Sequence, residues 1–353
     1  MNILEVDINK FNKNIDKIEN YTKKIVIPIL KANAYGTYIN KRLDVLNRFD
    51  IVGVSRVSEA IEIRNVGYNK EILVINPTTY DEIDNIIKYD ITICISNKEF
   101  ISELIKRKEK VKVQLEIETG MNRTGININD LDNICNIIKN TNIIVDGIYT
   151  HLSSADIDKE YTLIQLDKFK KSVNIAKKYF NLKYIHSSSS SGLLNYDDKI
   201  SNAVRPGLLI YGYKPFNENV IDVEPICKLK SRVVFIKEVD KNTSIGYSRT
   251  FITNKKTKIA TIQIGYADGL NRLLSNNGEV IINNTKCKII GNICMDSIMA
   301  DITGVDVNIG DDVYIFDNDL ITIDEIAKKC NTISYEILTN ISNRVDRTFV
   351  NIS

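Results

Sequence analysis

The chain has 353 residues, of which 43% are hydrophobic and 26% are charged, a composition typical of globular proteins and not of disordered ones. Lys and Arg number 47 and Asp and Glu number 45, so the formal net charge is +2 and does not favour nucleic acid or a membrane surface as a partner. This length allows a large core and two domains.

The first ten residues, MNILEVDINK, carry acidic residues and lack the apolar stretch of a signal peptide, so we expect a cytoplasmic protein. No apolar run approaches the roughly 18–20 residues that a membrane helix needs. The 6 cysteines are scattered without a CxxC pair, which favours reduced thiols over disulfides or a zinc site. With 2 histidines, His151 and His186, we expect no metal centre.

The first predicted element is an amphipathic helix, because Ile8, Phe11, Ile15 and Ile18 fall on one helical face. Beyond it, apolar runs that predict strands alternate with polar stretches of helical period. The predicted strands are residues 25–30, 51–54, 72–75, 91–95, 111–117, 143–148, 183–186 and 203–210, and helices are predicted over 57–66, 97–108, 128–139 and 161–179. Runs in this number and alternation, over about 220 residues, favour a (β/α)8 TIM barrel over an open doubly wound α/β sheet. No GxGxxG motif follows the first run, which argues against dinucleotide binding.

After residue 222 the pattern changes to strand-like segments separated by turn residues, with little helical period before TIDEIAKKC at 322–330. We therefore predict two domains, a barrel over residues 1–222 and a mostly β domain over residues 223–353.

Lys31 directly follows the first predicted barrel strand, in the segment ILKANAYG. The active sites of such barrels lie at the C-terminal ends of the strands. A lysine at a strand end is usually a surface residue, but a desolvated one can lose its proton and form a Schiff base with an aldehyde. The residues that follow Lys31 are small enough for a ligand to approach closely, and Tyr35 supplies a phenol.

KANAYG resembles the pyridoxal-phosphate lysine motif of the alanine racemases. Further segments are similar to that family and follow its order: ETGMNRTG at 118–125, GIYTHLSSAD at 147–156, VRPGLLIYG at 204–212, GYSRTF at 246–251, IGYADGLNR at 264–272, GNICMD at 291–296, GDDV at 310–313 and TISYEILTNISNRVDRTF at 332–349. Because these segments span nearly the whole chain, we identify it as a member of the alanine racemase family. The resemblance implies pyridoxal 5'-phosphate as cofactor, a small amino acid as substrate, and a homodimer in which each active site takes groups from both chains.

Racemisation removes the Cα proton from one face of an amino acid and returns a proton to the other face, while the cofactor acts as electron sink. The resemblance implies that Lys31 is the base for the D-isomer and that Tyr247, from the partner subunit, is the base for the L-isomer. A tyrosine pKa of about 10 must fall to roughly 7 for this role, a difference of about 4 kcal/mol. His151 and Arg205 match the family's network beside that phenol. Alone, His151 would be interpreted as a core histidine and Tyr247 as an exposed strand tyrosine.

Arg205 also matches the arginine that faces the pyridine nitrogen of the cofactor. Because an arginine does not readily give up its proton, it would leave that nitrogen unprotonated, weaken the electron sink and limit side reactions such as transamination. The resemblance assigns the phosphate to Tyr35, Ser190, the backbone amides near Gly207 and Leu208, and Tyr335. It assigns the substrate carboxylate to Arg123, which also serves the cofactor's phenolic oxygen, and to the backbone of the partner's Met295, with Tyr266 as an inner gate at the substrate entrance.

Three positions depart from the family. Glu116 stands where the family has a lysine that is often carbamylated, and we hypothesise that its carboxylate orients Arg123. Ser189 and Ser190 replace an Asn-Ser pair, and AYGTY at 34–38 replaces AYGHG. These changes concern affinity and substrate range more than the class of reaction.

The sequence thus predicts a racemase that interconverts L- and D-alanine and supplies D-alanine for peptidoglycan. A racemase of broader specificity, acting on serine or basic amino acids, remains an alternative. A related decarboxylase would carry a catalytic cysteine motif in its C-terminal part, whereas Cys294 in NICMD matches the racemases. A non-catalytic pyridoxal-phosphate-binding protein would consist of the barrel alone and would have no use for Tyr247 and Met295.

Overall fold

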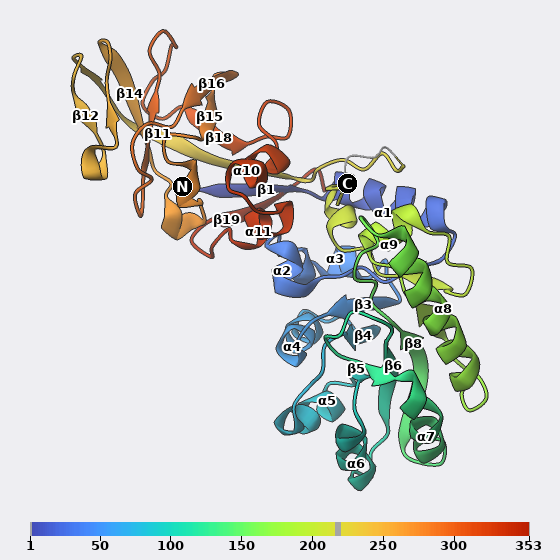
Figure 1. Cartoon of the computed structure of the whole chain (residues 1–353). Coiled ribbons are helices and arrows are strands. Elements are labelled where there is room, and N and C mark those ends of the chain that lie inside the picture. Colours follow the sequence, from blue (N-terminus) through green and yellow to red (C-terminus); the bar gives the residue numbers. More distant parts are fainter. Residues whose placement is uncertain (1, 216–219, 353) are drawn as a thin grey trace. The chain divides into compact units, whose positions relative to one another are not determined.

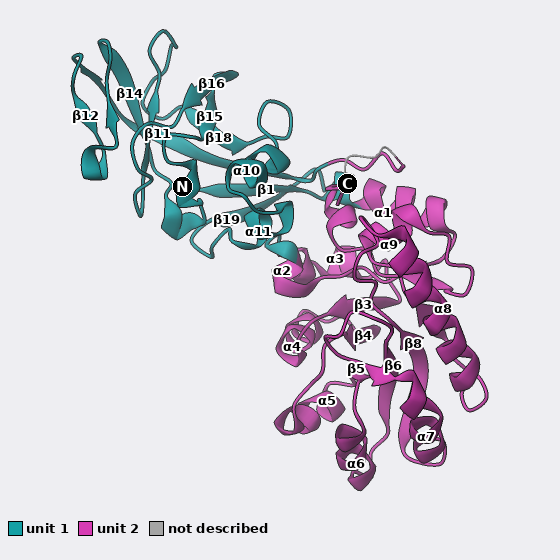
Figure 2. Ribbon diagram, viewed as in Figure 1, with its two compact units in different colours: residues 1–11, 35–37, 225–353 teal, residues 12–34, 38–224 magenta. Residues whose placement is uncertain are grey.

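The computed structural model describes residues 2–215 and 220–352, and the chain divides into two compact units (Figures 1 and 2). The barrel unit comprises residues 12–34 and 38–224, and the β unit comprises residues 1–11, 35–37 and 225–353. The change of unit after residue 224 lies close to the boundary expected after residue 222. Residues 1–11 and 35–37, which the prediction placed in the barrel, belong to the β unit.

The barrel unit is built on a parallel sheet. Its strands pair in the order β3 (Ile51–Val54), β4 (Glu71–Val74), β5 (Thr92–Ile95), β6 (Val111–Glu118), β8 (Ile143–Tyr149) and β9 (Tyr184–His186), and β7 (Ile126–Asn127) pairs with β6. A further parallel pair joins β2 (Ile25–Val26) to β10 (Ala203–Val204).

Backbone hydrogen bonds link this pair to both edges of the sheet. The amide of Asn202 donates to the carbonyl of Ile185 over 3.0 Å, and the amide of Gly53 donates to the carbonyl of Pro28 over 2.9 Å. The curled sheet therefore continues around a barrel, and the predicted (β/α)8 fold is confirmed. Pro28 lies outside the ladder of β2, so its missing N–H group interrupts no strand pairing.

Helices occupy the predicted stretches between the strands. They are α1 (Ile8–Thr22), α4 (Val57–Asn65), α6 (Lys98–Lys106), α7 (Ile128–Ile138) and α8 (Lys159–Ala176), joined by the shorter α3 (Leu43–Leu46), α5 (Ile83–Lys88) and α9 (Ser190–Asn195). The predicted face of α1 is buried at Ile8, Phe11, Ile15 and Ile18. The run over 203–210 is only partly a strand, because β10 ends at Val204 and the 3-10 helix η3 (Leu208–Tyr211) follows.

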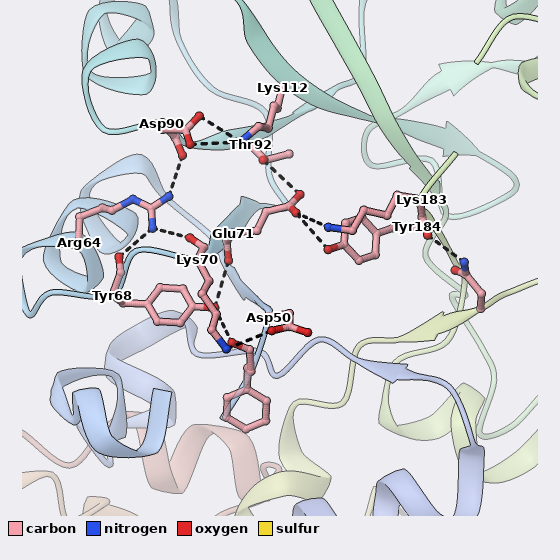
Figure 3. Close-up of polar contacts among 12 residues, drawn as sticks. Asp50, Arg64, Tyr68, Lys70, Glu71, Asp90, Thr92, Lys112, Lys183 and Tyr184 are labelled. Carbon is pink, nitrogen blue, oxygen red and sulfur yellow. Dashed lines mark hydrogen bonds and ion pairs between the residues drawn. The ribbon is translucent and has the colours of Figure 1, made fainter. Parts of the chain in front are cut away.

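Polar side chains gather where the parallel strands begin (Figure 3). Glu71, the first residue of β4, accepts hydrogen bonds from the Tyr184 hydroxyl over 3.0 Å and from Lys183 Nζ over 3.3 Å. Arg64 Nη2 donates to the backbone carbonyl of Asp90 over 2.8 Å. In barrels of this kind the N-terminal ends of the strands serve stability, and the C-terminal ends serve function.

The β unit is built on a mostly antiparallel sheet. Its strands follow the order β16 (Thr285–Lys288), β15 (Glu279–Ile282), β18 (Asp312–Phe316), β11 (Cys227–Val239), β1 (Ile3–Asp7) and β19 (Asp346–Val350), and β14 (Thr257–Ile262) pairs with both β11 and β17 (Ile298–Asp301). A small hairpin, β12 (Ser244–Ile245) and β13 (Phe251–Ile252), and two helices, α10 (Ile323–Lys329) and α11 (Ser334–Thr339), complete it. The mostly β C-terminal part is thus confirmed. Within the described residues, we find no helix with the length and apolarity needed to cross a membrane.

Candidate active site

Lys31 lies just beyond Ile29, the residue that bridges to Gly53 at the C-terminal side of β2. Its side chain is half-buried. Burial lowers the pKa of Lys31, the positive charge of Arg123 lowers it further, and the negative charge of Glu59 opposes both effects. A lysine amine with a lowered pKa is more often unprotonated and therefore more nucleophilic.

The backbone after Lys31 forms a left-handed turn. The φ angles are 53°, 54°, 52° and 56° at Ala32, Asn33, Ala34 and Tyr35. Each such residue costs roughly 1–2 kcal/mol, and strain of this kind concentrates at functional sites. The turn ends at Gly36, where φ is 79° and a Cβ atom would lie 2.5 Å from the carbonyl oxygen of Leu338. The sequence showed that small residues follow Lys31, but it did not predict the left-handed turn.

Arg205 is buried at the end of β10, and its terminal nitrogens are saturated by hydrogen bonds. Nη1 donates to His186 Nδ1 and to the His186 carbonyl, and Nη2 donates to the carbonyls of Thr150 and Ser187. The guanidinium carbon lies 5.1 Å from the centre of the Tyr149 ring. Burial lowers the pKa of Arg205 to about 10, so it stays a cation at neutral pH. Its Nε–H group has no partner within the described residues and remains for a ligand.

His186, to which the sequence pattern assigned no role, orients this arginine. Gln114 Oε1 lies 2.7 Å from His186 Nε2. An amide oxygen only accepts hydrogen bonds, so Nε2 carries the proton and Nδ1 accepts from Arg205. Burial, and then the charge of Arg205, hold the pKa of His186 well below its ordinary value. A neutral histidine thus joins Gln114 to Arg205, and its position at the C-terminal end of a predicted strand was the signal that could have identified it.

His151 follows β8 and is also neutral. Burial lowers its pKa to about 3, with further contributions from the positive charges of Arg205, Arg123 and Lys31. Its backbone carbonyl accepts a hydrogen bond of 3.3 Å from Gln165 Nε2. Because imidazolium is strongly disfavoured here, the ring can accept or donate a hydrogen bond without changing charge near neutral pH.

A cradle of donors surrounds the hydroxyl of Ser190. Its oxygen accepts from the amide of Gly207 over 3.1 Å and from the amide of Leu209 over 3.3 Å. The amide of Leu208, between them, donates no hydrogen bond within the described part of the chain. The Ser190 hydroxyl proton and the Leu208 amide are therefore left as donors suited to a phosphate.

Arg123 and Glu116 make no direct bond to each other. Arg123 is exposed and has no hydrogen-bond or ion-pair partner within residues 2–215 and 220–352. Glu116 is buried, its Oε1 accepts from Thr124 Oγ1 over 2.7 Å, and its Oε2 has no partner there. Burial raises the pKa of Glu116, which the Thr124 hydrogen bond and then Arg123 oppose. The hypothesis that Glu116 orients Arg123 therefore requires an indirect link, through Thr124 and through charge.

The remaining predicted residues lie in the β unit. The rings of Tyr35 and Tyr335 have centres 6.0 Å apart. Burial, and then Tyr335, raise the pKa of Tyr35, so its phenol stays protonated and can donate. Tyr247 is 70% exposed in the 3-10 helix η4 (Tyr247–Arg249), where Ser248 and Arg249 also have left-handed φ angles of 59° and 53°.

Tyr266 begins the 3-10 helix η5 (Tyr266–Asp268) of the β unit, and Met295 lies on a loop that bonds to it. The amide of Tyr266 donates to the carbonyl of Cys294, and the amide of Ala267 donates to the carbonyl of Met295, each over 3.0 Å. Both side chains are exposed. The predicted residues thus form a barrel-unit group (Lys31, Arg123, His151, Ser190, Arg205, Gly207 and Leu208) and a β-unit group (Tyr35, Tyr247, Tyr266, Met295 and Tyr335).

The barrel-unit group fits pyridoxal phosphate, the cofactor that the resemblance implies. Lys31 provides an amine for the aldehyde, the Ser190 cradle provides donors for the phosphate, and Arg205 Nε–H provides a donor for the ring nitrogen. The donors thus match the three chemical groups of that cofactor.

Comparison with known proteins links both units to one family. Residues 6–215 match the family model described as alanine racemase, N-terminal domain, and residues 226–349 match the model described as alanine racemase, C-terminal domain. A relative from Caldanaerobacter subterraneus, an alanine racemase, is 36% identical over 98% of this chain and 94% of its own length.

Solved structures agree with these matches. An alanine racemase from Clostridium difficile 630 is similar with a TM-score of 0.94 and 31% identity, over 98% of this chain and 95% of that one. An alanine racemase from Bartonella henselae, solved with covalently bound pyridoxal phosphate, is similar with a TM-score of 0.89 and 25% identity over 99% of both chains.

Proposed function

The chain belongs to the alanine racemase family, and we propose that it is a pyridoxal-phosphate-dependent enzyme that interconverts L- and D-alanine. The observation that carries the proposal is the half-buried amine of Lys31, with its lowered pKa, in one unit with the Ser190 cradle and Arg205. We further propose that the D-alanine is used for peptidoglycan. The six free cysteines suit a reducing compartment, which supports a cytoplasmic location.

When bound, pyridoxal phosphate supplies an electron sink for the charge that develops at the substrate Cα. Lys31 Nζ, as a neutral amine, takes the Cα proton of D-alanine from one face. The Tyr247 phenol of a partner subunit gives a proton to the opposite face and becomes a phenolate. In the reverse direction this phenolate takes the proton of L-alanine and the Lys31 ammonium returns one, so no proton is gained or lost overall.

The other residues position these groups. Arg205 holds its proton at neutral pH, and its Nε–H group would donate to the cofactor's ring nitrogen without protonating it. His186 and Gln114 fix the orientation of Arg205. Ser190, the amides near Gly207 and Leu208, Tyr35 and Tyr335 would bind the phosphate. Arg123 and the partner's Met295 backbone would bind the substrate carboxylate, with Tyr266 at the entrance and His151 and Arg205 beside the phenol.

We propose that the chain acts as a homodimer with shared active sites. Apolar side chains near Tyr247 in the sequence are exposed on the β unit: Phe235 is 53% exposed and Ile252 is 55% exposed. Met295 is also 53% exposed. The homodimer is proposed from the family, and these exposed apolar side chains are among those that such an interface would bury.

The direct test is to incubate the purified protein, loaded with pyridoxal phosphate, with L-alanine or with D-alanine and to separate the products by chiral chromatography. Both reactions should end at equal amounts of the two isomers, because enantiomers have equal free energies in solution. Lys31→Ala should lose the reaction, and parallel reactions with L-serine, L-lysine and L-arginine define the substrate range. Absence of D-alanine, or release of carbon dioxide, would contradict the proposal.

A further inference from the structure

Glu59 bonds to two separate backbone segments at once. Its Oε2 accepts from the amides of Ser55 over 2.8 Å and Arg56 over 3.1 Å, and its Oε1 accepts from the amide of Ala32 over 2.6 Å. Ser55 and Arg56 lie between β3 and α4, whereas Ala32 begins the left-handed turn after Lys31. All four residues belong to the barrel unit.

Helix capping explains only half of this arrangement. Glu59 is the third residue of α4, and a glutamate there normally returns to the amide at the helix start. Oε2 alone makes that contact. Oε1 is not needed for the cap, and it accepts from an amide 27 positions earlier in the chain.

The segment that Glu59 holds is unfavourable by itself, because consecutive non-glycine residues there have positive φ angles. Such a conformation persists only when the surrounding structure imposes it. A carboxylate bonded to the first amide of the turn is a strong constraint, since hydrogen bonds to charged groups are stronger than neutral ones. The negative charge of Glu59 also favours the ammonium form of Lys31 and raises its pKa.

We propose that Glu59 is a positioning residue for Lys31. Its carboxylate ties the start of α4 to the left-handed turn and so fixes the backbone from which Lys31 reaches the cofactor. The consequence of this assignment for catalysis rests on the proposed function. The hydrogen bond from the Ala32 amide to Glu59 can be measured without turnover.

Two substitutions separate the effect of the hydrogen bonds that Glu59 makes to both segments from the effect of its negative charge on Lys31. Glu59→Gln keeps the length and one carbonyl oxygen for the helix cap, but its NH2 group then faces the Ala32 amide. Glu59→Asp keeps the negative charge near Lys31, but its shorter side chain does not span both segments. Glu62→Gln, one turn along α4 and exposed, is the matched control.

Three readouts are followed in the full-length protein. The first is hydrogen–deuterium exchange of a peptide covering residues 30–36, which reports on the Ala32 amide. The second is the rate at which bound pyridoxal phosphate leaves the protein. The third is the pH dependence of Lys31 labelling by an amine reagent in the cofactor-free protein, quantified by peptide mass spectrometry, with the melting temperature as reference.

We expect exchange and cofactor loss to accelerate about tenfold in both Glu59 variants, because one charge-assisted hydrogen bond is lost. Lys31 labelling at neutral pH should rise about two- to fivefold in Glu59→Gln and stay near wild type in Glu59→Asp, because only the first removes the charge. A purely structural role would make all readouts follow the melting temperature.

The assignment is overturned if both Glu59 variants match Glu62→Gln in exchange and cofactor loss. A wild-type protein that does not attach pyridoxal phosphate at Lys31 would instead contradict the proposed function. In that case exchange at residues 30–36 still decides whether Glu59 holds the turn.

Discussion

Burial fixes the charge of three side chains in the barrel unit, His151, Arg205 and His186. The pKa of His151 is lowered to about 3 and that of Arg205 to about 10, so neither changes protonation between roughly pH 5 and 9. His186 is likewise held neutral. The pH dependence of the proposed reaction should therefore not show a histidine titration.

Glu116 is a buried carboxylate of the same unit, and its charge can be tested directly. Glu116→Gln keeps an acceptor for Thr124 but removes negative charge near Arg123 and Arg205. We expect KM for alanine to rise about three- to tenfold, because a neutral amide holds the Thr124 hydroxyl, and through it the segment of Arg123, less strongly than a carboxylate does. Steady-state kinetics and cofactor titration measure this, with exposed Glu99→Gln as control.

The same substitution should change the pH dependence of stability. Burial raises the pKa of Glu116, so the folded chain binds a proton there more tightly than the unfolded chain does. This proton contributes to the free energy of unfolding at low pH, and the contribution is lost as the pH rises through the pKa of Glu116 in the folded chain. Glu116→Gln should therefore gain melting temperature relative to wild type on going from pH 5 to pH 8. The hypothesis that Glu116 orients Arg123 fails if Glu116→Gln leaves both cofactor affinity and kcat/KM unchanged.

The strands of the barrel unit were predictable because they are buried on both faces. In β3, each residue is buried, and such continuous apolar runs stand out in the sequence. β1 was missed because its buried residues alternate with partly buried ones, so it forms no continuous apolar run, and because it pairs with β11 and β19, which lie more than 200 positions away. An opening helix was predicted instead, and it begins only at Ile8.

The left-handed turn was not predictable from local propensity, because alanine and asparagine give no strong signal for it. Ala32 is exposed within the turn, so its conformational strain can be tested without disturbing a core. Ala32→Gly removes about 1 kcal/mol or more of strain and loses roughly 0.5–1 kcal/mol through chain entropy, so the free energy of unfolding should be equal or higher. Ala32→Val should lower it by at least about 1 kcal/mol, as measured by urea unfolding. Equal stability of the Gly and Val variants would refute the strain.

Glu71, the first residue of β4, and Asp146, in the middle of β8, form a carboxyl pair whose titration can be tested. Burial, and then Glu71, raise the pKa of Asp146 in β8 to about 8. The unfolded chain releases this proton near pH 4, so wild type loses stability as pH rises from about 4 to 8. Asp146→Asn, which keeps the shape and can donate to Glu71, should be more stable than wild type at pH 8, by about 1–3 kcal/mol.

This gain should shrink toward pH 5, and urea unfolding at several pH values measures it. Asp90→Asn is the control, because Asp90 is exposed and pairs with Lys112 at the same end of the sheet as Glu71. A gain that does not depend on pH would show that Asp146 and Glu71 share no proton.

Over the whole molecule, only Lys31 could be predicted from its position after a barrel strand. His151 and Arg205 also follow barrel strands, but their roles came from the resemblance. Tyr247 and Met295 came from the resemblance alone, since exposed residues outside the strands and α-helices have no periodic pattern. His186 and Glu59 were missed because their roles depend on partners far away in the sequence.

The most direct test of a two-base site shared between subunits is complementation between two inactive subunits. Lys31→Ala and Tyr247→Phe chains, each with its own affinity tag, are expressed together, and the mixed dimers are isolated by using both tags in turn. If each site combines Lys31 of one chain with Tyr247 of the other, one of the two sites is intact, and the dimer should racemise alanine at about half the wild-type rate. A rate no higher than that of either variant alone would contradict the shared two-base site.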